Sequence, residues 1–375
     1  MTARLQRAVQ AARGRAELAS ARVRTRSWPP GSRLFVLGES LGWALDDEAA
    51  YVRSTAERLG YAVGPTGWAR GSVGQAVFHT SHFAGLDPLW TSSSHALGIA
   101  YFHGRPGTPG FPEFDRALAA LEAAPDRCAR VQVTHAEMHE LVVAAGVAEE
   151  RVHRIPIGIE LERFPLGDAA AKEAARARLG LPASAFVVGS FQKDGVGWGD
   201  GLEPKAIKGP DVLVAALERV ARAAPELVVL LTGPARGYVR QELSRRGIAH
   251  VHVLLDDRDE LPAAYHALDA YLVASRQEGG PKSILESMAS GVPLVSTVVG
   301  QAPELVVDGV NGLLAPVEDD EALAAAVVRA RDDAALVAAL RTAGRATAEE
   351  TSHEALVPRW ARLLDGFVTR DGGAA

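Results

Sequence analysis

Cysteine, lysine and long apolar runs are scarce in this 375-residue chain, and each scarcity limits the classes of protein and of site that the sequence can form. The single cysteine, Cys128, excludes an internal disulfide framework and fits a reducing compartment, so we expect a cytoplasmic protein. No stretch approaches the roughly 18 to 20 apolar residues of a membrane-spanning helix, and the first residues lack the apolar core of a secretion signal. The net charge of −6 gives no support for nucleic acid as a partner.

The scarcity of lysine makes the position of each lysine informative. Arginine outnumbers lysine 35 to 5. One of the five, Lys172, lies on an expected charged helix. The other four fall in two short segments of the second half: Lys193, Lys205, Lys208 and Lys282.

Residues 1–32 form a basic tail, with seven arginines against the single acid Glu17, a net charge of +6. Leu5, Val9, Ala12 and Ala16 recur at helical spacing, which would allow weak peripheral contact with an anionic membrane. The stripe is mostly alanine and lacks leucine or aromatic anchors, so a solvated or locally packed tail is the favoured interpretation.

The rest of the chain alternates short apolar runs with helical patterns, which is typical of successive βαβ units. Strands are expected at 33–37, 73–79, 97–102, 129–133 and 152–157, and again at 186–190, 227–231, 250–254, 270–274 and 294–298, with helices alone from there to about residue 368. A Pro-containing stretch near residue 165 interrupts this rhythm. We therefore expect an α/β protein with two Rossmann-like, doubly wound domains facing each other across a cleft. The expected domains are 33–165 and 166–350, with 351–375 as a C-terminal helix that returns toward the first domain.

The strongest motif runs from Glu278 to Glu286, E-G-G-P-K-S-I-L-E, after an expected strand and into a helix beginning at Pro281. Gly279 and Gly280 allow a ligand close to the backbone, and the free N–H groups of the first helical turn favour an anion such as a diphosphate. Glu286 is suited to accept hydrogen bonds from ribose hydroxyls. The pattern alone equally fits charge complementing the helix dipole.

A second motif, Gly189 to Asp211, follows the first strand of the second half. Four glycines alternate between Gly195 and Gly201, which predicts a mobile loop and not a dinucleotide or P-loop turn. The segment brings Lys193, Lys205 and Lys208 near the ligand edge of the sheet, where each charge-assisted contact to phosphate contributes about 1.5 to 3 kcal/mol.

These residues resemble the retaining glycosyltransferases of family 4, which have the GT-B fold. The resemblance rests on E-G-G-P-K-S-I-L-E-S-M-A-S-G-V-P-L-V-S-T (278–297), V-G-Q-A-P-E (299–304) and D-G-V-N-G (308–312), and more loosely on I-P-I-G-I-E-L-E-R-F (155–164). It implies that Glu286 binds the donor ribose, Glu278 the transferred sugar and Lys208 the diphosphate, with Gly279, Gly280, Pro281 and Lys282 around the donor. Ser190 stands near the place where the family commonly has an arginine, and Lys193 is the candidate substitute.

The resemblance also assigns residues of the first half. Gly38 and Gly42 lie in the loop after the first strand, near the donor phosphates and the acceptor. His103, at the end of an expected strand, takes the place of a histidine that contacts the reacting sugar; without the resemblance, a structural histidine is the simpler interpretation.

The implied reaction is metal-independent transfer, with retention of configuration, from a UDP- or GDP-sugar to a small-molecule, lipid-linked or saccharide acceptor. No cofactor is expected. His135 and His139 fail the H-E-x-x-H pattern, so no metal site is expected either. Alternatives are a nucleotide-sugar epimerase or phosphorylase on the same fold, a non-catalytic nucleotide-sugar-binding subunit and, with least support, a dehydrogenase.

Overall fold

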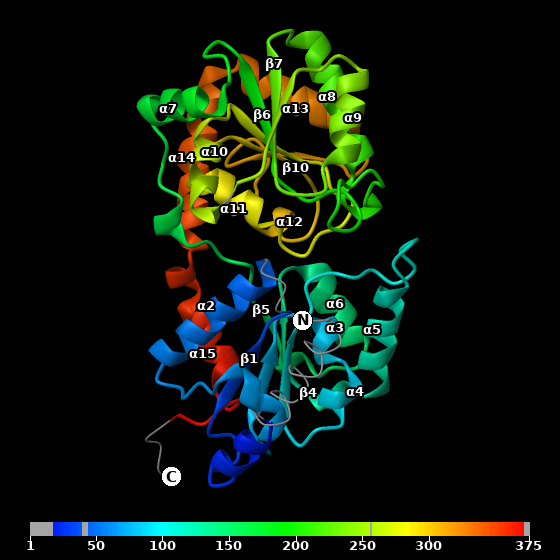
Figure 1. The fold of residues 1–375 in the computed structure, drawn as a ribbon, viewed down its shortest axis with the longest axis vertical. Helices are drawn as coiled ribbons and strands as arrows, with labels where there is room; N and C mark the ends of the chain where they lie inside the picture. Colours follow the sequence, from blue (N-terminus) through cyan, green and yellow to red (C-terminus); the bar gives the residue numbers. More distant parts are fainter. Residues whose placement is uncertain (1–17, 40–43, 256, 371–375) are drawn as a thin grey trace, which may run out of the picture. The chain divides into compact units, whose positions relative to one another are not determined.

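The chain divides into two compact units, which are described separately. The computed structural model describes residues 18–39, 44–255 and 257–370 (Figure 1). Unit 1 comprises Met1–Ile155 and Val357–Ala375, and unit 2 comprises Pro156–Leu356. The boundary therefore lies ten residues before the expected position at 165/166, and the chain passes between the units again after Leu356.

Unit 1 is a five-stranded parallel sheet with its strands in sequence order. The strands are β1 (Leu34–Leu37), β2 (Ala76–His79), β3 (Ala96–Ala100), β4 (Cys128–Val133) and β5 (Val152–Arg154). The helices are α2 (Ala44–Arg58), α3 (His82–Gly85), α4 (Pro88–Thr91), α5 (Pro112–Ala123) and α6 (Ala136–Ala144), with the 3-10 turn η1 (Thr66–Gly71) after α2. Val63 makes a further parallel bridge to Leu34.

The last helix, α15 (His353–Leu364), completes the core of unit 1. Trp360 is fully buried and meets Tyr51 and Phe78 edge to face, with ring centroids 6.1 and 5.6 Å apart. Phe367 packs where a Cβ on Gly98 would lie only 2.9 Å from its ring. Unit 1 is thus built from both ends of the chain.

The described part of the basic tail packs onto unit 1. Residues 18–24 are helical, and Ala21 is fully buried. Trp28 contacts Phe35 and Trp68, with ring centroids 6.3 and 6.0 Å apart. This part of the tail is locally packed, whereas the apolar stripe from Leu5 to Ala16, on which the alternative of membrane contact depends, lies outside the described residues.

Unit 2 is a six-stranded parallel sheet of order β11-β10-β9-β6-β7-β8. The strands are β6 (Phe186–Ser190), β7 (Leu227–Thr232), β8 (His250–Val253), β9 (Ala270–Val273), β10 (Leu294–Thr297) and β11 (Leu313–Ala315). The helices are α7 (Ala169–Leu179), α8 (Pro210–Ala223), α9 (Gly237–Arg245), α10 (Leu261–His266), α11 (Lys282–Ala289), α12 (Ala302–Leu305), α13 (Asp320–Asp332) and α14 (Ala334–Glu350). The expectation of helices alone after residue 298 was wrong, because β11 adds an edge strand.

The strands of unit 2 are apolar on both faces because helices cover both. Val188 and Val229 lie in one core with α8 and α13, whereas Val187 and Leu230 lie in another with α10 and α11. This alternation follows the two-residue period of a strand. Strands buried on both sides are typical of a doubly wound parallel sheet.

The order of the unit 2 strands reverses beside β6. β7 and β8 extend the sheet on one side of β6, and β9, β10 and β11 extend it on the other. In doubly wound sheets ligands bind outside the carboxyl ends of the strands at such a reversal. The carboxyl ends of β6 and β9 therefore mark the place to look for a site.

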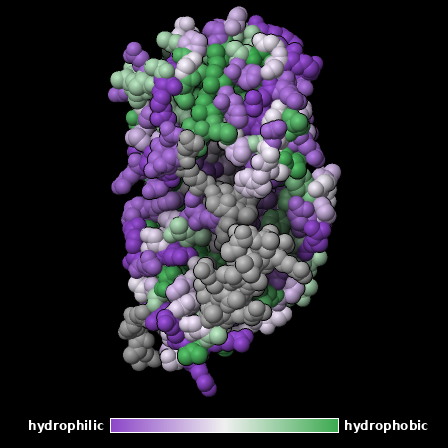
Figure 2. Space-filling model, in the orientation of Figure 1, coloured by the Kyte–Doolittle hydropathy of each residue, from purple (hydrophilic) through white to green (hydrophobic). Residues whose placement is uncertain are grey.

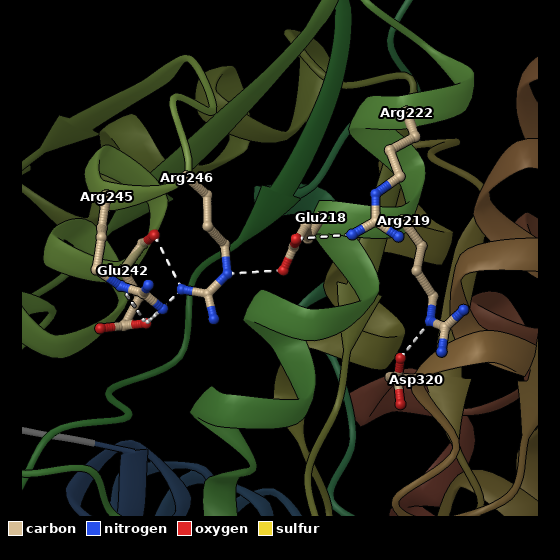
Figure 3. A network of polar contacts seen from close by, with 7 residues as sticks. All are labelled: Glu218, Arg219, Arg222, Glu242, Arg245, Arg246 and Asp320. Carbon is tan, nitrogen blue, oxygen red and sulfur yellow. Dashed lines mark hydrogen bonds and ion pairs between the residues drawn. The ribbon is translucent and has the colours of Figure 1, made fainter.

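Charged side chains link the outer helices of unit 2 (Figure 3). Arg246 binds Glu218 of α8 and Glu242 of α9, and Arg219 of α8 binds Asp320 of α13. On the face shown in Figure 2, hydrophobic residues lie among hydrophilic ones. Within the described ranges, no helix combines the length and apolar character needed to span a bilayer.

Candidate functional site

An ion pair joins the two charged motifs at the strand-order reversal. The Lys208 ammonium donates to both carboxylate oxygens of Glu278, each at 2.6 Å. Ser275, two residues after β9, donates its hydroxyl to Glu278 Oε1 at 2.8 Å. Gln192, two residues after β6, donates its amide to the Lys208 carbonyl at 3.1 Å. The cluster thus gathers residues from the ends of both strands.

Gly209 explains why the lysine can approach β9 so closely. Its φ is +59°, and an added Cβ would lie 2.0 Å from the carbonyl oxygen of Ala274. Only glycine fits such a left-handed position against backbone. The backbone N–H groups of Arg276 and Gln277 then donate to the Ile207 carbonyl at 2.9 and 3.0 Å. Lys208 and Gly209 therefore lie where η5 (Ala206–Lys208) packs tightly against the end of β9.

Glu286 lies on α11, and a buried tyrosine holds its carboxylate. The Tyr265 hydroxyl donates to Glu286 Oε2 at 2.8 Å. Burial, and next the Glu286 charge, raise the pKa of Tyr265 well above its ordinary value, so its proton stays in this hydrogen bond. The neighbouring Tyr271 hydroxyl accepts a hydrogen bond from the Phe191 backbone at 2.9 Å, which ties the end of β6 to the same cluster.

The segment between the two glutamates turns tightly before α11. Pro281 caps the helix, which begins at Lys282, one residue later than expected. The Gly279 carbonyl accepts a hydrogen bond from the Gln301 backbone at 3.1 Å. At Gly280 a Cβ would lie 2.6 Å from the Gln301 side chain, so this glycine makes room for protein as well as for any ligand.

The glycine-rich segment folds as an anchored hairpin, where the sequence had suggested a mobile loop. Gly195 pairs with Pro204, and the Val196 N–H donates to the Glu203 carbonyl at 2.9 Å. The Gly237 N–H at the start of α9 donates to the Asp200 carbonyl at 2.6 Å. Glycine is required at Gly201, where a Cβ would lie 2.3 Å from the carbonyl of Ala235.

A buried ion pair lies at the base of this hairpin. Asp194 and Arg236 are both fully buried, with their charged atoms 3.0 Å apart. Burial raises the pKa of Asp194, against the opposing effect of Arg236. Arg236 also donates to the Ser190 carbonyl at 2.6 Å, so Ser190 lies inside the domain against this guanidinium.

Lys193, the proposed substitute for the family arginine, lies over Trp198 of the hairpin. Its ammonium is 3.8 Å from the centre of the indole ring, and burial lowers its pKa. The structure therefore brings Lys208 and Glu278 together but places Lys193 on the hairpin.

The site residues assigned to unit 1 are His103, Gly38 and Gly42. His103 packs edge to face on Phe114, with ring centroids 5.5 Å apart. At Gly38 a Cβ would lie 2.3 Å from the Asp46 side chain, so this glycine allows α2 to start close to β1. Gly42 lies outside the described residues. Across the described ranges, no group of three or more His, Cys, Asp or Glu side chains could hold a metal ion.

The sequence did not identify Ser275, Gln192, Tyr265 and Arg236 as parts of this site. Each is a common residue type with no local motif. The one available signal was position, because Ser275 and Gln192 follow strands whose carboxyl ends form the ligand edge.

Comparison with known proteins supports the resemblance. Residues 198–333 match the model of the family described as glycosyl transferases group 1. The chain is 31% identical over 292 residues to D-inositol 3-phosphate glycosyltransferase 1 of Catenulispora acidiphila, covering 73% of this chain and 64% of the relative. It is 32% identical over 249 residues to the D-inositol 3-phosphate glycosyltransferase of Saccharomonospora viridis, covering 63% and 53%. The chain thus spans between half and two thirds of the length of these curated relatives.

The fold matches solved glycosyltransferase structures over most of the chain. Anabaena HepE, crystallised with UDP-glucose, aligns with a TM-score of 0.71 and 19% identity over 89% of this chain and 99% of HepE. Sucrose-phosphate synthase from Thermosynechococcus elongatus aligns with a TM-score of 0.65 and 22% identity over 85% and 77%. These comparisons show the GT-B fold and a similarity to family 4-like glycosyltransferases.

Proposed function

We propose that this chain transfers a sugar from a nucleotide-diphosphate donor to an acceptor hydroxyl, with retention of configuration and without a metal ion. The observation that carries the proposal is the Lys208–Glu278 pair at the strand-order reversal, with Glu286 eight residues further on. A cation and two carboxylates at this edge match a ligand that combines a diphosphate with two sets of hydroxyl groups.

Each residue has a separate task in the proposed reaction. Glu286, oriented by Tyr265, holds the ribose hydroxyls, and Glu278 holds hydroxyls of the transferred sugar. The bond between the anomeric carbon and the diphosphate breaks, and the acceptor oxygen bonds to that carbon on the same face. The acceptor proton passes to the departing diphosphate. Lys208 and the first turn of α11 stabilise the charge that develops there, in place of a metal ion.

UDP is the preferred nucleotide in this proposal, because the HepE neighbours were crystallised with UDP or UDP-glucose. D-Inositol 3-phosphate is the first acceptor to screen, since the curated relatives are named for it. A cytoplasmic location completes the proposal and rests on the single buried cysteine.

The first test is calorimetric titration with UDP and GDP in the presence of EDTA. We expect the wild type to bind UDP, and Glu286→Ala to bind it about ten- to a hundredfold more weakly, because a charged hydrogen-bond acceptor contributes about 1.5 to 3 kcal/mol. Glu173→Ala, an exposed glutamate on α7, is the matched control and should bind like wild type. Equal binding by Glu286→Ala and wild type would refute the donor site.

Product analysis separates the proposal from its rivals on the same fold. UDP-glucose incubated with and without acceptor should give a glycoside only when acceptor is present. An epimerised donor in both tubes indicates an epimerase, and sugar phosphate formed with inorganic phosphate indicates a phosphorylase. Nucleotide binding without any product would support the non-catalytic subunit.

A further inference from the structure

The hairpin of residues 194–205 carries an apolar surface that the proposed function does not use. Val196, Trp198 and Leu202 are 46%, 57% and 53% exposed. They are three of the eleven large apolar side chains exposed among the described residues, and no other aromatic side chain in those ranges is as exposed as Trp198. Single exposed apolar side chains are normal, whereas three within seven residues indicate a contact surface. These three residues are called the hairpin surface below.

The hairpin lies at the carboxyl edge of the unit 2 sheet. It follows β6 and leads directly into η5, which carries Lys208. At its tip the carbonyls of Asp200 and Gly201 accept hydrogen bonds from the first two N–H groups of α9, at 2.6 and 2.9 Å. Because α9 follows β7, the hairpin is held beside the carboxyl ends of β6 and β7. It therefore borders the strand-order reversal, where ligands of such sheets bind.

Lys193 shows how close the indole of Trp198 lies to the end of β6. This lysine is three residues beyond Ser190, the last residue of β6, and its ammonium is 3.8 Å from the centre of the indole ring. The ring is thus within the length of one lysine side chain of the backbone that leaves the strand. Trp198 is 57% exposed even with this contact, so much of the indole is open to a ligand.

Trp198 and the residues assigned to the ribose are placed by helices on opposite faces of the unit 2 sheet. Tyr265 and α11 pack in one core, whereas α9, which holds the hairpin, packs in the other through Leu243. The Lys208–Glu278 pair lies at the strand ends between these two layers of helices. The nucleoside and Trp198 are therefore on opposite sides of the proposed reacting centre. The substrate on the side of Trp198 is then the acceptor.

The charges of the hairpin favour an uncharged occupant. From residue 193 to 205, two lysines are balanced by the exposed acids Asp200 and Glu203, and the remaining acid, Asp194, is paired with buried Arg236. A segment without net charge does not attract anionic lipid headgroups or nucleic acid. Apolar groups, in contrast, gain by covering exposed indole and aliphatic surface.

We propose that the hairpin surface binds an apolar substituent of the acceptor, an aromatic ring or an alkyl chain attached to the ring that carries the reacting hydroxyl. The substituent packs on the Trp198 indole and on the side chains of Val196 and Leu202. The preference of this surface for an apolar group stands without the proposed function, whereas its assignment to the acceptor rests on that function. It concerns the substituent of the acceptor and not the ring that reacts.

The test compares glycosides that differ only in an apolar substituent. Phenyl and methyl β-D-glucoside, and phenyl and methyl α-D-mannoside, are titrated calorimetrically into the full chain without nucleotide, so that the result does not depend on the donor site. In at least one pair the phenyl compound should bind about tenfold or more tightly than the methyl compound, because it buries more apolar surface. Trp198→Ala should remove this preference, and Trp198→Phe, which retains an aromatic ring, should keep most of it.

Controls separate this contact from other causes. Val73→Ala changes an exposed valine of unit 1 that precedes β2, and should keep the wild-type preference. Trp198→Ala should melt at the wild-type temperature, because the side chain it removes is exposed. The proposal is overturned if no phenyl compound binds more tightly than its methyl partner, or if Trp198→Ala keeps the preference. It is also overturned if sedimentation shows a dimer that Trp198→Ala dissociates, since a second copy would then cover the hairpin surface. The UDP titration described above reports on the proposed function separately.

Discussion

The Lys208 ammonium is already held by a carboxylate before any nucleotide arrives. Both Glu278 oxygens lie 2.6 Å from Lys208 Nζ, and the glutamate side chain is only 9% exposed. A diphosphate that reaches this lysine must compete with Glu278 or share the cation with it. The same carboxylate is proposed to hold the transferred sugar. Removing its charge should therefore strengthen nucleotide binding but slow sugar transfer.

Replacing Glu278 by Gln should tighten UDP binding severalfold, because the competing negative charge is gone while the hydrogen bond to Ser275 can persist. Sugar transfer should fall about a hundredfold or more, as expected when a group that orients the reacting centre is lost. Calorimetry with UDP and steady-state kinetics with UDP-glucose measure the two effects. Lys208→Met should weaken UDP binding; equal weakening in both variants would show that the carboxylate does not compete.

Buried neutral histidines should make the protein sensitive to mild acid. The pKa of His79 is lowered to about 4, mainly by burial, whereas an unfolded histidine titrates near 6.5. Below pH 6.5 the unfolded state binds the extra proton, so stability falls as the pH drops toward 4. Between pH 6.5 and 5 this one residue should lower the free energy of unfolding by about 2 kcal/mol.

Urea denaturation at pH 7.5 and pH 5 checks this expectation against His79→Phe. The variant should lose less stability than wild type on acidification, by about that 2 kcal/mol. An identical loss in both proteins would mean that the pKa of His79 is not lowered in the folded state.

Among the elements, the turn from η5 into α8 depends on one glycine. Gly209→Ala combines a left-handed backbone with a Cβ placed 2.0 Å from the Ala274 carbonyl. We expect a loss of more than about 2 kcal/mol in stability and, because Lys208 shifts, loss of UDP binding. Gly180→Ala is the matched control, since Gly180 has φ +66° at the end of α7 with nothing within 4 Å.

Denaturation and UDP titration of the two variants separate the effect of left-handed backbone strain from the effect of the contact between residue 209 and the Ala274 carbonyl. Gly180→Ala should lose only the 1 to 2 kcal/mol of left-handed strain, roughly, and keep UDP binding. If Gly209→Ala behaves in the same way, the contact with β9 does not position Lys208.

Most elements could be predicted because their patterns are local. β6 was predicted with its observed ends, Phe186 and Ser190, from its short run of apolar residues. β11 has only three residues and carries no periodic signal, so it was missed. The expected strand at 73–79 begins at Ala76, because Gly74 takes φ +64° and Val73 is 72% exposed.

The scarcity of lysine drew attention to Lys208, whereas the family resemblance assigned the roles of Glu278 and Glu286. These assignments stay predictions. Tyr265 of α10 reaches Glu286 of α11 through the packing of the two helices, and Ser275 lies only three residues before Glu278; neither residue has a local motif that marks it. Gly195 and Gly201 allow close backbone contact with Ala235, a role that a linear pattern of glycines does not reveal; the mobility of this loop stays a prediction.

For the whole molecule, the two units differ in how the chain builds them. Unit 2 is one continuous segment, so a fragment of residues 156–356 should unfold cooperatively and bind UDP in EDTA. A fragment of residues 1–155 lacks Trp360 and Phe367 and should not unfold cooperatively. Thermal unfolding of each fragment, followed by circular dichroism, measures this cooperativity. Adding a peptide of residues 357–375 to the 1–155 fragment should restore a cooperative transition. A cooperative transition for 1–155 alone would show that α15 is dispensable.

The late arrival of Trp360 also sets an order of events during translation. Unit 2 is complete in the nascent chain when residue 356 has been added, whereas unit 1, although synthesised first, still lacks the side chain that lies against Phe78 and Tyr51. The apolar surface of the amino-terminal sheet that Trp360 covers therefore stays exposed while some two hundred further residues are synthesised. Synonymous codons that slow the ribosome over residues 156–356 would lengthen the time for which this surface is exposed. They would also increase the dependence of folding on a chaperone.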